Sequence, residues 1–390
     1  MNTPSKLIFI SFFLFSFLAF FAGFRYNAWN VLENGLVLDI QGESMVVGRL
    51  VKSRTDGVFS SAGLCGRCND GLKDSSLFAY QFKAYENDIP CKKFEPYLSQ
   101  TGLHAAAYGL IDSATPFSPK KTLSLIRDVK SATLAMVMSL VILWFFLEMG
   151  LLPAIFVFLG VLLTPWFTFL GRDLLLCVWT NYLPFLVALF LLRNEHNRRA
   201  LSEFRILLFS SLAILANFVL NGYEWVTTTL IMASIPFFYY WKKDNWPIKK
   251  LRRRISWLVA GSLTALLVSF STLIFQISKV KGTTQAGIDW LIFSFQKRTF
   301  GAADQLPEII EKQLDHSIWE VFKFNFGGAA FLLPSFLADH LSFFFNRIFF
   351  AEIVFLLMIL TFLLINQSNF LKISSEKKKT LKNLAIISWI

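Results

Sequence analysis

Charged residues are scarce in this chain. Only 16% of its 390 residues are Asp, Glu, Lys or Arg, whereas 55% are hydrophobic and 44 are Phe. A soluble protein rarely buries so much apolar surface, and several apolar runs exceed the roughly 18 residues that a spanning helix requires. The composition excludes an ordinary soluble domain. It predicts an all-α, polytopic bundle of transmembrane helices, with two large outer loops that carry amphipathic helices.

Signatures of nucleotide and metal chemistry are also missing from the sequence. It has no phosphate-binding glycine loop, no nucleotide-binding fingerprint and no zinc-protease helix, which argues against an ATP-driven pump. Histidine is rare, and His196, His316 and His340 are isolated, without the spacing of metal ligands. These three histidines are therefore interpreted as solvated or interfacial side chains.

The positive charge is concentrated in three stretches, each next to an apolar segment. Residues 193–205 hold four Arg, residues 242–254 hold seven Lys or Arg, and residues 367–390 hold five Lys. Loops on the cytoplasmic side of a membrane carry such an excess of Lys and Arg. This bias accounts for the net charge of +12, so no nucleic-acid partner is expected; the expected partners are membrane lipids.

In this interpretation, eight apolar segments cross the membrane in alternating directions. Alternation puts all three basic stretches and the N-terminus in the cytoplasm, which fits the bacterial cytoplasmic membrane. The first segment is interpreted as an uncleaved anchor, because its small-residue cleavage pattern is poor. The segments are 7–24, 132–148, 151–170, 174–192, 206–220, 226–241, 255–276 and 348–365.

This topology divides the chain into five regions. They are an N-terminal anchor helix (1–24), a first outer loop region (25–130), helices two to seven (131–276), a second outer loop region (277–347), and a last helix with a basic cytoplasmic tail (348–390). Amphipathic helices are expected at 101–111 in the first loop, and at 286–296 and 331–345 in the second. Residues 384–390 either start another spanning helix or lie on the interface.

The first outer loop contains three of the four cysteines, Cys65, Cys68 and Cys91. A structural disulfide is favoured because this loop faces an oxidising compartment. Free thiols remain an alternative, as does redox or metal chemistry, since Cys65 and Cys68 have the spacing of a redox pair. Cys177 lies in an apolar segment and is interpreted as a core residue.

Two short outer turns carry charge close to the membrane. Arg172 and Asp173 occupy one of them, and Glu224 occupies the other, at 222–225. Ionisable groups at this depth usually pair or bind a ligand. Arg172 either forms a local ion pair or holds a lipid-linked phosphate, because guanidinium suits phosphate oxygens. Glu224 either caps a helix in solvent or lines a cavity between helices.

The first loop also carries acids close behind the anchor helix. Glu43 and Asp56 are candidates for a general base, which requires a pKa tuned by its surroundings. Candidate substrate-binding residues are Arg172 and Asp173 of the outer turn, with Arg49, Arg54, Gln100 and His104 of the loop. The alternative for residues 39–57 is an ordinary polar loop.

An anchor helix, a large outer loop with acids soon after it, and closely spaced helices with short turns together resemble the GT-C class of membrane glycosyltransferases. The stretches 48–60, 164–172 and 222–225 are also similar to a group of bacterial polytopic proteins. The resemblance implies transfer of a sugar from a polyprenyl-phosphate donor on the outer face. It assigns the base, or a ligand of a divalent metal cofactor, to Glu43 or Asp56, the phosphate contact to Arg172 and a cleft acid to Glu224.

Two other functions remain open from the sequence. A transporter or flippase of a lipid-linked substrate would use the charged turns as a path. A non-catalytic envelope assembly protein would use its outer loops to bind a partner. The sequence leaves open the sugar, the acceptor, the metal and the oligomeric state.

Overall fold

The computed structural model describes residues 6–29, 40–69, 71, 74–197, 201–223 and 225–300, with the short stretches 319, 329–332 and 347–349. The eighth apolar segment, the basic tail, Glu224 and the helix expected at 331–345 fall wholly or mostly outside these residues.

Helices dominate the described part of the chain. In order they are α1 (Lys6–Tyr26), α2 (Ile40–Asp56), α3 (Asp74–Glu86), α4 (Leu103–Ala114), α5 (Pro119–Met149), α6 (Leu151–Leu163), α7 (Pro165–Arg172), α8 (Trp179–His196), α9 (Glu203–Asn221), α10 (Val226–Lys243), α11 (Ile248–Lys281) and α12 (Thr284–Phe300). A short 3₁₀ helix, η1, spans Ser60–Gly63, and the strands are β1 (Gly66–Cys68), β2 (Phe94–Pro96), β3 (Ala329–Leu332) and β4 (Arg347–Phe349).

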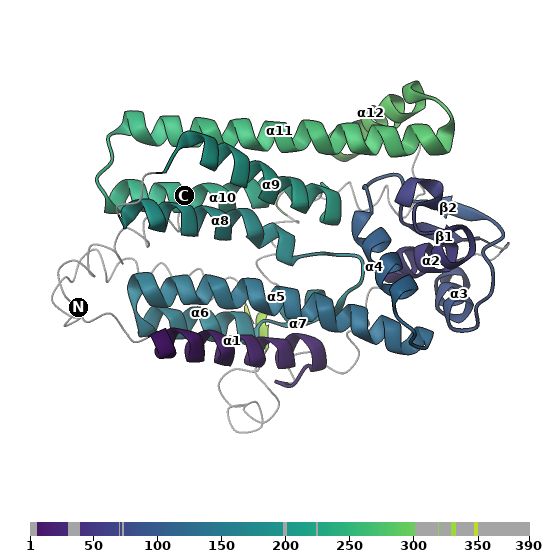
Figure 1. Cartoon of the computed structure of the whole chain (residues 1–390), viewed down its shortest axis with the longest axis horizontal. Helices are drawn as coiled ribbons and strands as arrows, with labels where there is room; N and C mark the ends of the chain where they lie inside the picture. The colour runs from purple at the N-terminus through teal and green to yellow at the C-terminus, as the bar shows by residue number, and fades with distance from the viewer. Residues whose placement is uncertain are drawn as a thin grey trace.

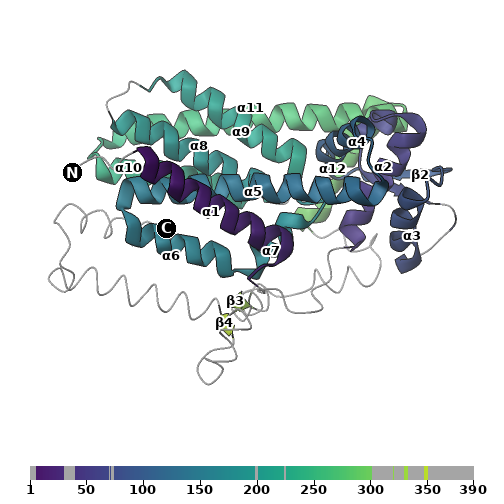
Figure 2. The same ribbon diagram turned by 60° about the horizontal axis from the view of Figure 1, so that its bottom comes forward.

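The long helices lie side by side along the longest axis of the molecule, as Figures 1 and 2 show. At one end, α2, α3 and α4 with the two-stranded β1–β2 sheet form a compact unit, which we call the cap. Helix α12 folds back beside α11 at the same end. The loops that join α8 to α9 and α10 to α11 lie at the opposite end, which we call the basic end.

In the part of the chain that the structure describes, four helices are long and apolar enough to cross a membrane: α1, α5, α9 and α11. Helices α6 and α7, which are bent by 61° at Thr164, form a fifth span if they are counted together. The protein is therefore an integral membrane protein with an all-α bundle. Helices α8 and α10 run in the same bundle but fall short of this apolar length, so the eight crossings stay a prediction.

Helix α5 differs from its predicted extent. The apolar segment expected at 132–148 is the second half of a single helix that begins at Pro119, well inside the region assigned to the first outer loop. Proline is favoured at the first helical turn, where its missing N–H costs nothing. The helix ends at Gly150, which has a φ of 95°. Its first turns pack into the cap, where Leu123 and Ile126 belong to the hydrophobic core.

The cap has its own hydrophobic core, separate from the two that fill the bundle. Strands β1 and β2 are antiparallel, with Arg67 opposite Glu95. Helix α2 packs closely against this two-stranded sheet at Gly48, where a Cβ atom would lie 2.4 Å from the carbonyl oxygen of Gly66. The helix expected at 101–111 is present as α4, which begins at Leu103 after Gly102 in a left-handed conformation.

Candidate functional site

Charged side chains from four elements meet where the cap joins the bundle. Arg25 comes from the last turn of α1, Glu43 from the first turn of α2, Arg127 from α5, and Arg172 from the end of α7. The charges of Arg25, Arg127 and Glu43 all act on the Arg172 guanidinium. We call these four residues the arginine cluster.

Glu43 is the buried acid of the arginine cluster, with only 1% of its side chain exposed. Its Oε2 accepts a hydrogen bond of 2.7 Å from Arg127 Nη2, and its Oε1 accepts one of 3.1 Å from the backbone N–H of Leu174. Burial raises the pKa of Glu43 above its ordinary value of 4.5; Arg127 opposes this change, and Asp173 adds to it. The carboxylate is thus held in place and is more basic than an exposed glutamate.

Among the described residues, Arg172 is the cation of the cluster that forms no ion pair. Arg25 pairs with Asp128 and donates to Ser124 Oγ at 2.7 Å, and Arg127 pairs with Glu43. Arg172 forms no hydrogen bond or ion pair with any residue that the structure describes, and its Nε atom is buried. A buried guanidinium donor normally has an acceptor, so this side chain is placed to receive an anion.

Asp173 shapes the backbone that follows Arg172. It is fully buried, and its Oδ1 accepts hydrogen bonds from the N–H groups of Leu175 and Leu176, at 2.9 and 2.7 Å. Such bonds compete with helical ones. The segment predicted as helical from 174 therefore starts its helix later, with α8 at Trp179. Lys130 Nζ fixes the same stretch by donating to the Leu176 carbonyl at 2.9 Å.

Close packing of α7 against α1 brings Arg172 to the cluster. A Cβ atom at Gly171 would lie 2.9 Å from Cβ of Phe24, so the two helices approach more closely here than a larger residue allows. The Ser131 hydroxyl donates to the Gly171 carbonyl at 3.0 Å and ties α5 to the same point. Three helices thus fix the position of the Arg172 backbone.

The second candidate base, Asp56, lies at the other end of α2 from Glu43. Thirteen residues of helix separate them, which corresponds to about 20 Å. Asp56 is exposed and pairs with Lys52 one turn earlier. Asp56 and Glu43 therefore cannot act on the same atom, and only Glu43 lies in the arginine cluster.

Arg49 and Arg54 are occupied within the cap. Arg49 is fully buried and donates to the carbonyl groups of Gly57, Val58 and Ser60, which follow α2. Its burial lowers the pKa of Arg49 to about 10. The guanidinium of Arg54 binds both carboxylate oxygens of Asp112, each at 2.8 Å, and also pairs with Asp88. These contacts hold the cap together, away from the arginine cluster.

Gln100 and His104 lie in a different part of the junction, next to the end of α9. A Cβ atom at Gly222 would lie 2.9 Å from Gln100 Oε1, and the neighbouring Thr101 hydroxyl donates to the Val219 carbonyl at 2.6 Å. Burial, and then the charge of Lys130, lower the pKa of His104 to about 3. His104 is therefore neutral at physiological pH and cannot neutralise a phosphate.

The structure joins Cys68 to Cys91 in a disulfide and leaves Cys65 as a buried thiol. Cys65 Sγ lies 3.9 Å from His104 Nε2. Burial raises the pKa of Cys65 to about 12, so the group is a thiol rather than the reactive thiolate. Within the described residues, no three His, Cys, Asp or Glu side chains are placed to hold a metal ion.

Sequence reasoning identified Glu43, Arg172 and Asp173, which the structure brings together. Arg25, Arg127 and Lys130 are not distinguishable from the other residues of the first outer loop by sequence alone. Their one signal in the sequence is that basic residues flank the apolar runs of α1 and α5. Glu224 lies outside the described residues, so its predicted role has no geometry to compare.

The chain was compared with protein-family models, with curated proteins and with solved structures, and no match was found. The candidate site therefore rests on its own geometry: a buried carboxylate beside three arginines, one of which lacks a counterion among the described residues.

Proposed function

We propose that this protein is a membrane glycosyltransferase that moves a sugar from a polyprenyl-phosphate donor to an acceptor on the outer face of the membrane. The observation that carries the proposal is the half-buried Arg172 side chain, whose buried Nε atom has no hydrogen-bond partner among the described residues. Guanidinium groups bind phosphate oxygens through two parallel, charge-assisted hydrogen bonds. The donor's phosphate is the anion that we assign to Arg172.

The position of Arg172 suits a lipid-linked donor. It ends the α6–α7 pair, which is apolar enough to form one bent span. A polyprenyl chain remains in the bilayer while its phosphate stays at the polar boundary, and Arg172 lies at such a boundary between the bundle and the cap. Arg25 and Arg127 add positive charge beside it.

Glu43 is the residue that we assign as general base. Its carboxylate takes the proton of the acceptor hydroxyl, and the hydroxyl oxygen forms the new bond to the anomeric carbon of the sugar. The bond from that carbon to the phosphate oxygen breaks, and its electron pair leaves with the polyprenyl phosphate. The raised pKa of Glu43 makes its carboxylate a stronger base than that of an exposed glutamate.

The topology of this proposal has eight spans, with both termini in the cytoplasm of a bacterial cell and the cap outside. This topology is supported by the positions of the cap and the basic end, because the two lie at opposite ends of the molecule (Figure 1). Loops rich in Lys and Arg stay in the cytoplasm, so the cap faces outward.

Binding of polyprenyl phosphate to the purified protein tests the proposal. Wild type should bind saturably, and Arg172→Ala should bind about tenfold more weakly, because a charge-assisted hydrogen bond is lost. Lys281→Ala is the control, since Lys281 is exposed at the same end of the molecule and has no ion pair among the described residues. Equal binding by all three proteins, or none by wild type, would contradict the proposal and favour a non-catalytic assembly protein.

A further inference from the structure

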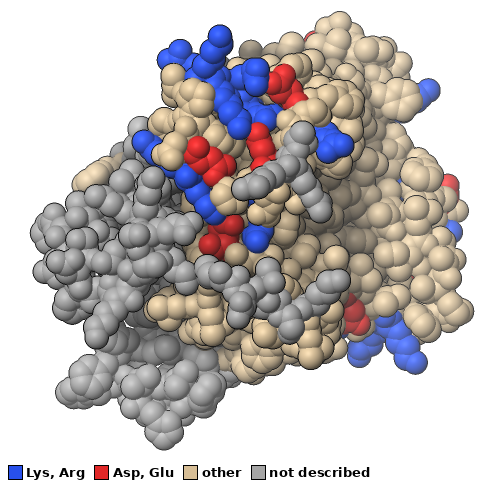
Figure 3. Space-filling view, turned by 60° about the vertical axis from the view of Figure 1, so that its left-hand side comes forward, with Lys and Arg blue, Asp and Glu red and all other residues tan. Residues whose placement is uncertain are grey.

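The basic end of the molecule carries more cations than its acids can neutralise. Figure 3 shows Lys and Arg gathered there with fewer acids between them. Its buried acid is Glu148, at the end of α5, which pairs with Arg193 of α8 and Lys243 of α10. Glu195 pairs with Lys250 and Arg254 of α11 in the same way. These pairs join α5, α8, α10 and α11 and account for the buried cations.

The other acids that the structure describes at this end are also paired. Glu203 of α9 pairs with Arg253 of α11 at 2.7 Å, and Asp244 pairs with His196 at 2.7 Å. Four exposed cations therefore form no ion pair with any described residue: Arg205, Lys242, Lys249 and Arg252. Lys249 and Arg252 are three residues apart on the first turns of α11, so they lie on the same side of the helix.

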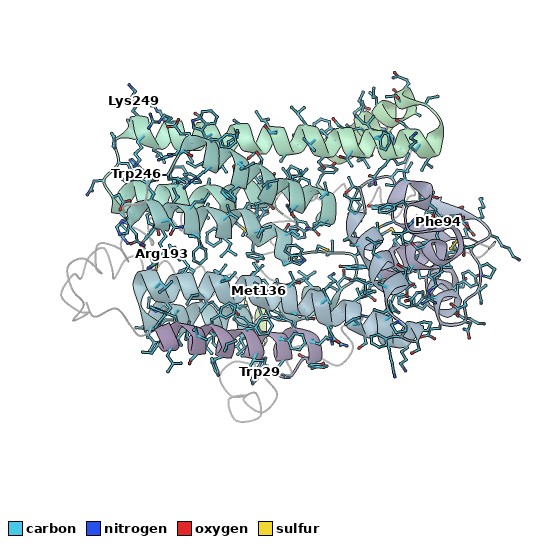
Figure 4. All side chains as sticks on the ribbon, in the orientation of Figure 1. Trp29, Phe94, Met136, Arg193, Trp246 and Lys249 are labelled. Atoms are coloured by element: carbon cyan, nitrogen blue, oxygen red, sulfur yellow. A yellow bond between two sulfur atoms is a disulfide. The ribbon has the colours of Figure 1, made fainter. Side chains whose placement is uncertain are left out.

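Apolar and aromatic side chains border these free cations. Phe204, beside Arg205, is 64% exposed, and Ile248, beside Lys249, is 51% exposed. Lys242 lies over the Trp241 ring at 4.2 Å from its centroid. Tryptophan and basic residues next to exposed apolar groups mark the level where acyl chains meet lipid head groups. In Figure 4, Arg193, Trp246 and Lys249 lie at this end, far from Phe94 in the cap.

We propose that Arg205, Lys242, Lys249 and Arg252 form a binding surface for anionic phospholipids of the leaflet that borders the basic end. These four exposed positive charges are not neutralised by any acid that the structure describes, and an anionic head group supplies negative charge at the same depth. The exposed Phe204 and Ile248 contact the acyl chains of the same lipids. This surface is at the opposite end from the arginine cluster and does not depend on the transfer reaction.

The test titrates the full-length purified protein in detergent with phosphatidylglycerol and, separately, with phosphatidylcholine of the same chain length. Bound lipid is counted by native mass spectrometry. Wild type should retain more phosphatidylglycerol than phosphatidylcholine. The variant Lys249→Gln/Arg252→Gln should bind phosphatidylglycerol about tenfold more weakly than wild type does, since each surface cation adds to the attraction. The control is Lys120→Gln/Lys121→Gln, which removes the same charge from two exposed lysines at the start of α5, near the cap.

Three outcomes would overturn the proposal. One is equal binding of the two lipids by wild type, and another is an equal loss of binding in the variant and its control. The third is tighter binding of a polyglutamate peptide than of phosphatidylglycerol, which would indicate an acidic protein partner. If Lys249→Gln/Arg252→Gln unfolds at a lower temperature than wild type, Arg205→Gln/Lys242→Gln replaces it, with the same expected result.

Discussion

Glu43 and Arg127 are 84 residues apart in the chain and form an ion pair of 2.7 Å between the cap and α5. The two partners differ in their exposure to solvent: 1% of the Glu43 side chain is exposed, whereas 20% of the Arg127 side chain is exposed. This asymmetry means that the loss of one partner is not equivalent to the loss of the other. The carboxylate depends on the guanidinium more than the reverse.

The first prediction concerns stability. Arg127→Gln should lower the free energy of unfolding by about 3 kcal/mol, because it leaves a buried carboxylate without its counterion. Glu43→Gln should cost less than about 1 kcal/mol, since Arg127 can reach water. Thermal unfolding of both variants and of the double variant in detergent measures this. If Glu43→Gln is the more damaging change, the asymmetry does not exist.

The second prediction concerns pH. Burial raises the pKa of Glu43 above 4.5, so the folded protein binds this proton more tightly than the unfolded chain. The stability that the proton contributes is complete below pH 4.5 and is lost as pH rises through the raised folded-state pKa. Wild type should therefore lose stability relative to Glu43→Gln as the pH rises above 4.5. Parallel melting curves of the two proteins at every pH would contradict the prediction.

The third prediction separates chemistry from folding. Glu43→Gln should reduce release of polyprenyl phosphate from a polyprenyl-phosphate sugar about 100-fold or more, because a general base is lost, while the variant still binds polyprenyl phosphate. Asp56→Asn is the matched control on the same helix and should keep wild-type activity. Equal loss in both variants would remove Glu43 from its assigned role.

The fourth prediction concerns the disulfide. Cys68 and Cys91 are 23 residues apart, so closing this loop should stabilise the protein by about 3 kcal/mol. Cys68→Ser/Cys91→Ser should lower the melting temperature, and dithiothreitol should lower that of wild type but not of the variant. Cys65 should stay unreactive to maleimide in the folded protein, since its thiol is buried and its pKa is raised to about 12. Rapid labelling of Cys65 would show that the cap opens.

The helical bundle could be predicted from the sequence because long apolar segments are typical of membrane-spanning helices. The limits of the helices were harder to predict. Residues 119–130 looked like loop because their polar side chains hid the continuation of α5, which the cap packing supports. Residues 174–178 looked helical because they are apolar, but the Asp173 carboxylate takes the N–H groups that a helix would use.

The residues of the candidate site were also only partly predictable from the sequence. Arg172 could be singled out because charge near a membrane is rare, and Glu43 because it is an acid that closely follows the anchor helix. Arg25 and Arg127 could not, because their partners are fixed by tertiary packing and not by local spacing. Asp56 shares a helix with Glu43, yet only the length of that helix shows that the two acids are far apart.

Helix α5 passes without a break from the bundle into the cap, over 31 residues and about 46 Å. A continuous helix is stiff, so α5 holds the cap at a set distance from the bundle. Elsewhere on the cap, Thr101 donates to Val219, Gln276 donates to Ala62 and Thr101, and Trp290 donates to Leu98. Leu64 and Leu98 also pack with Leu273 and Ile277 of α11 in a buried apolar cluster. The cap therefore cannot tilt away from α11 without exposing this cluster to water.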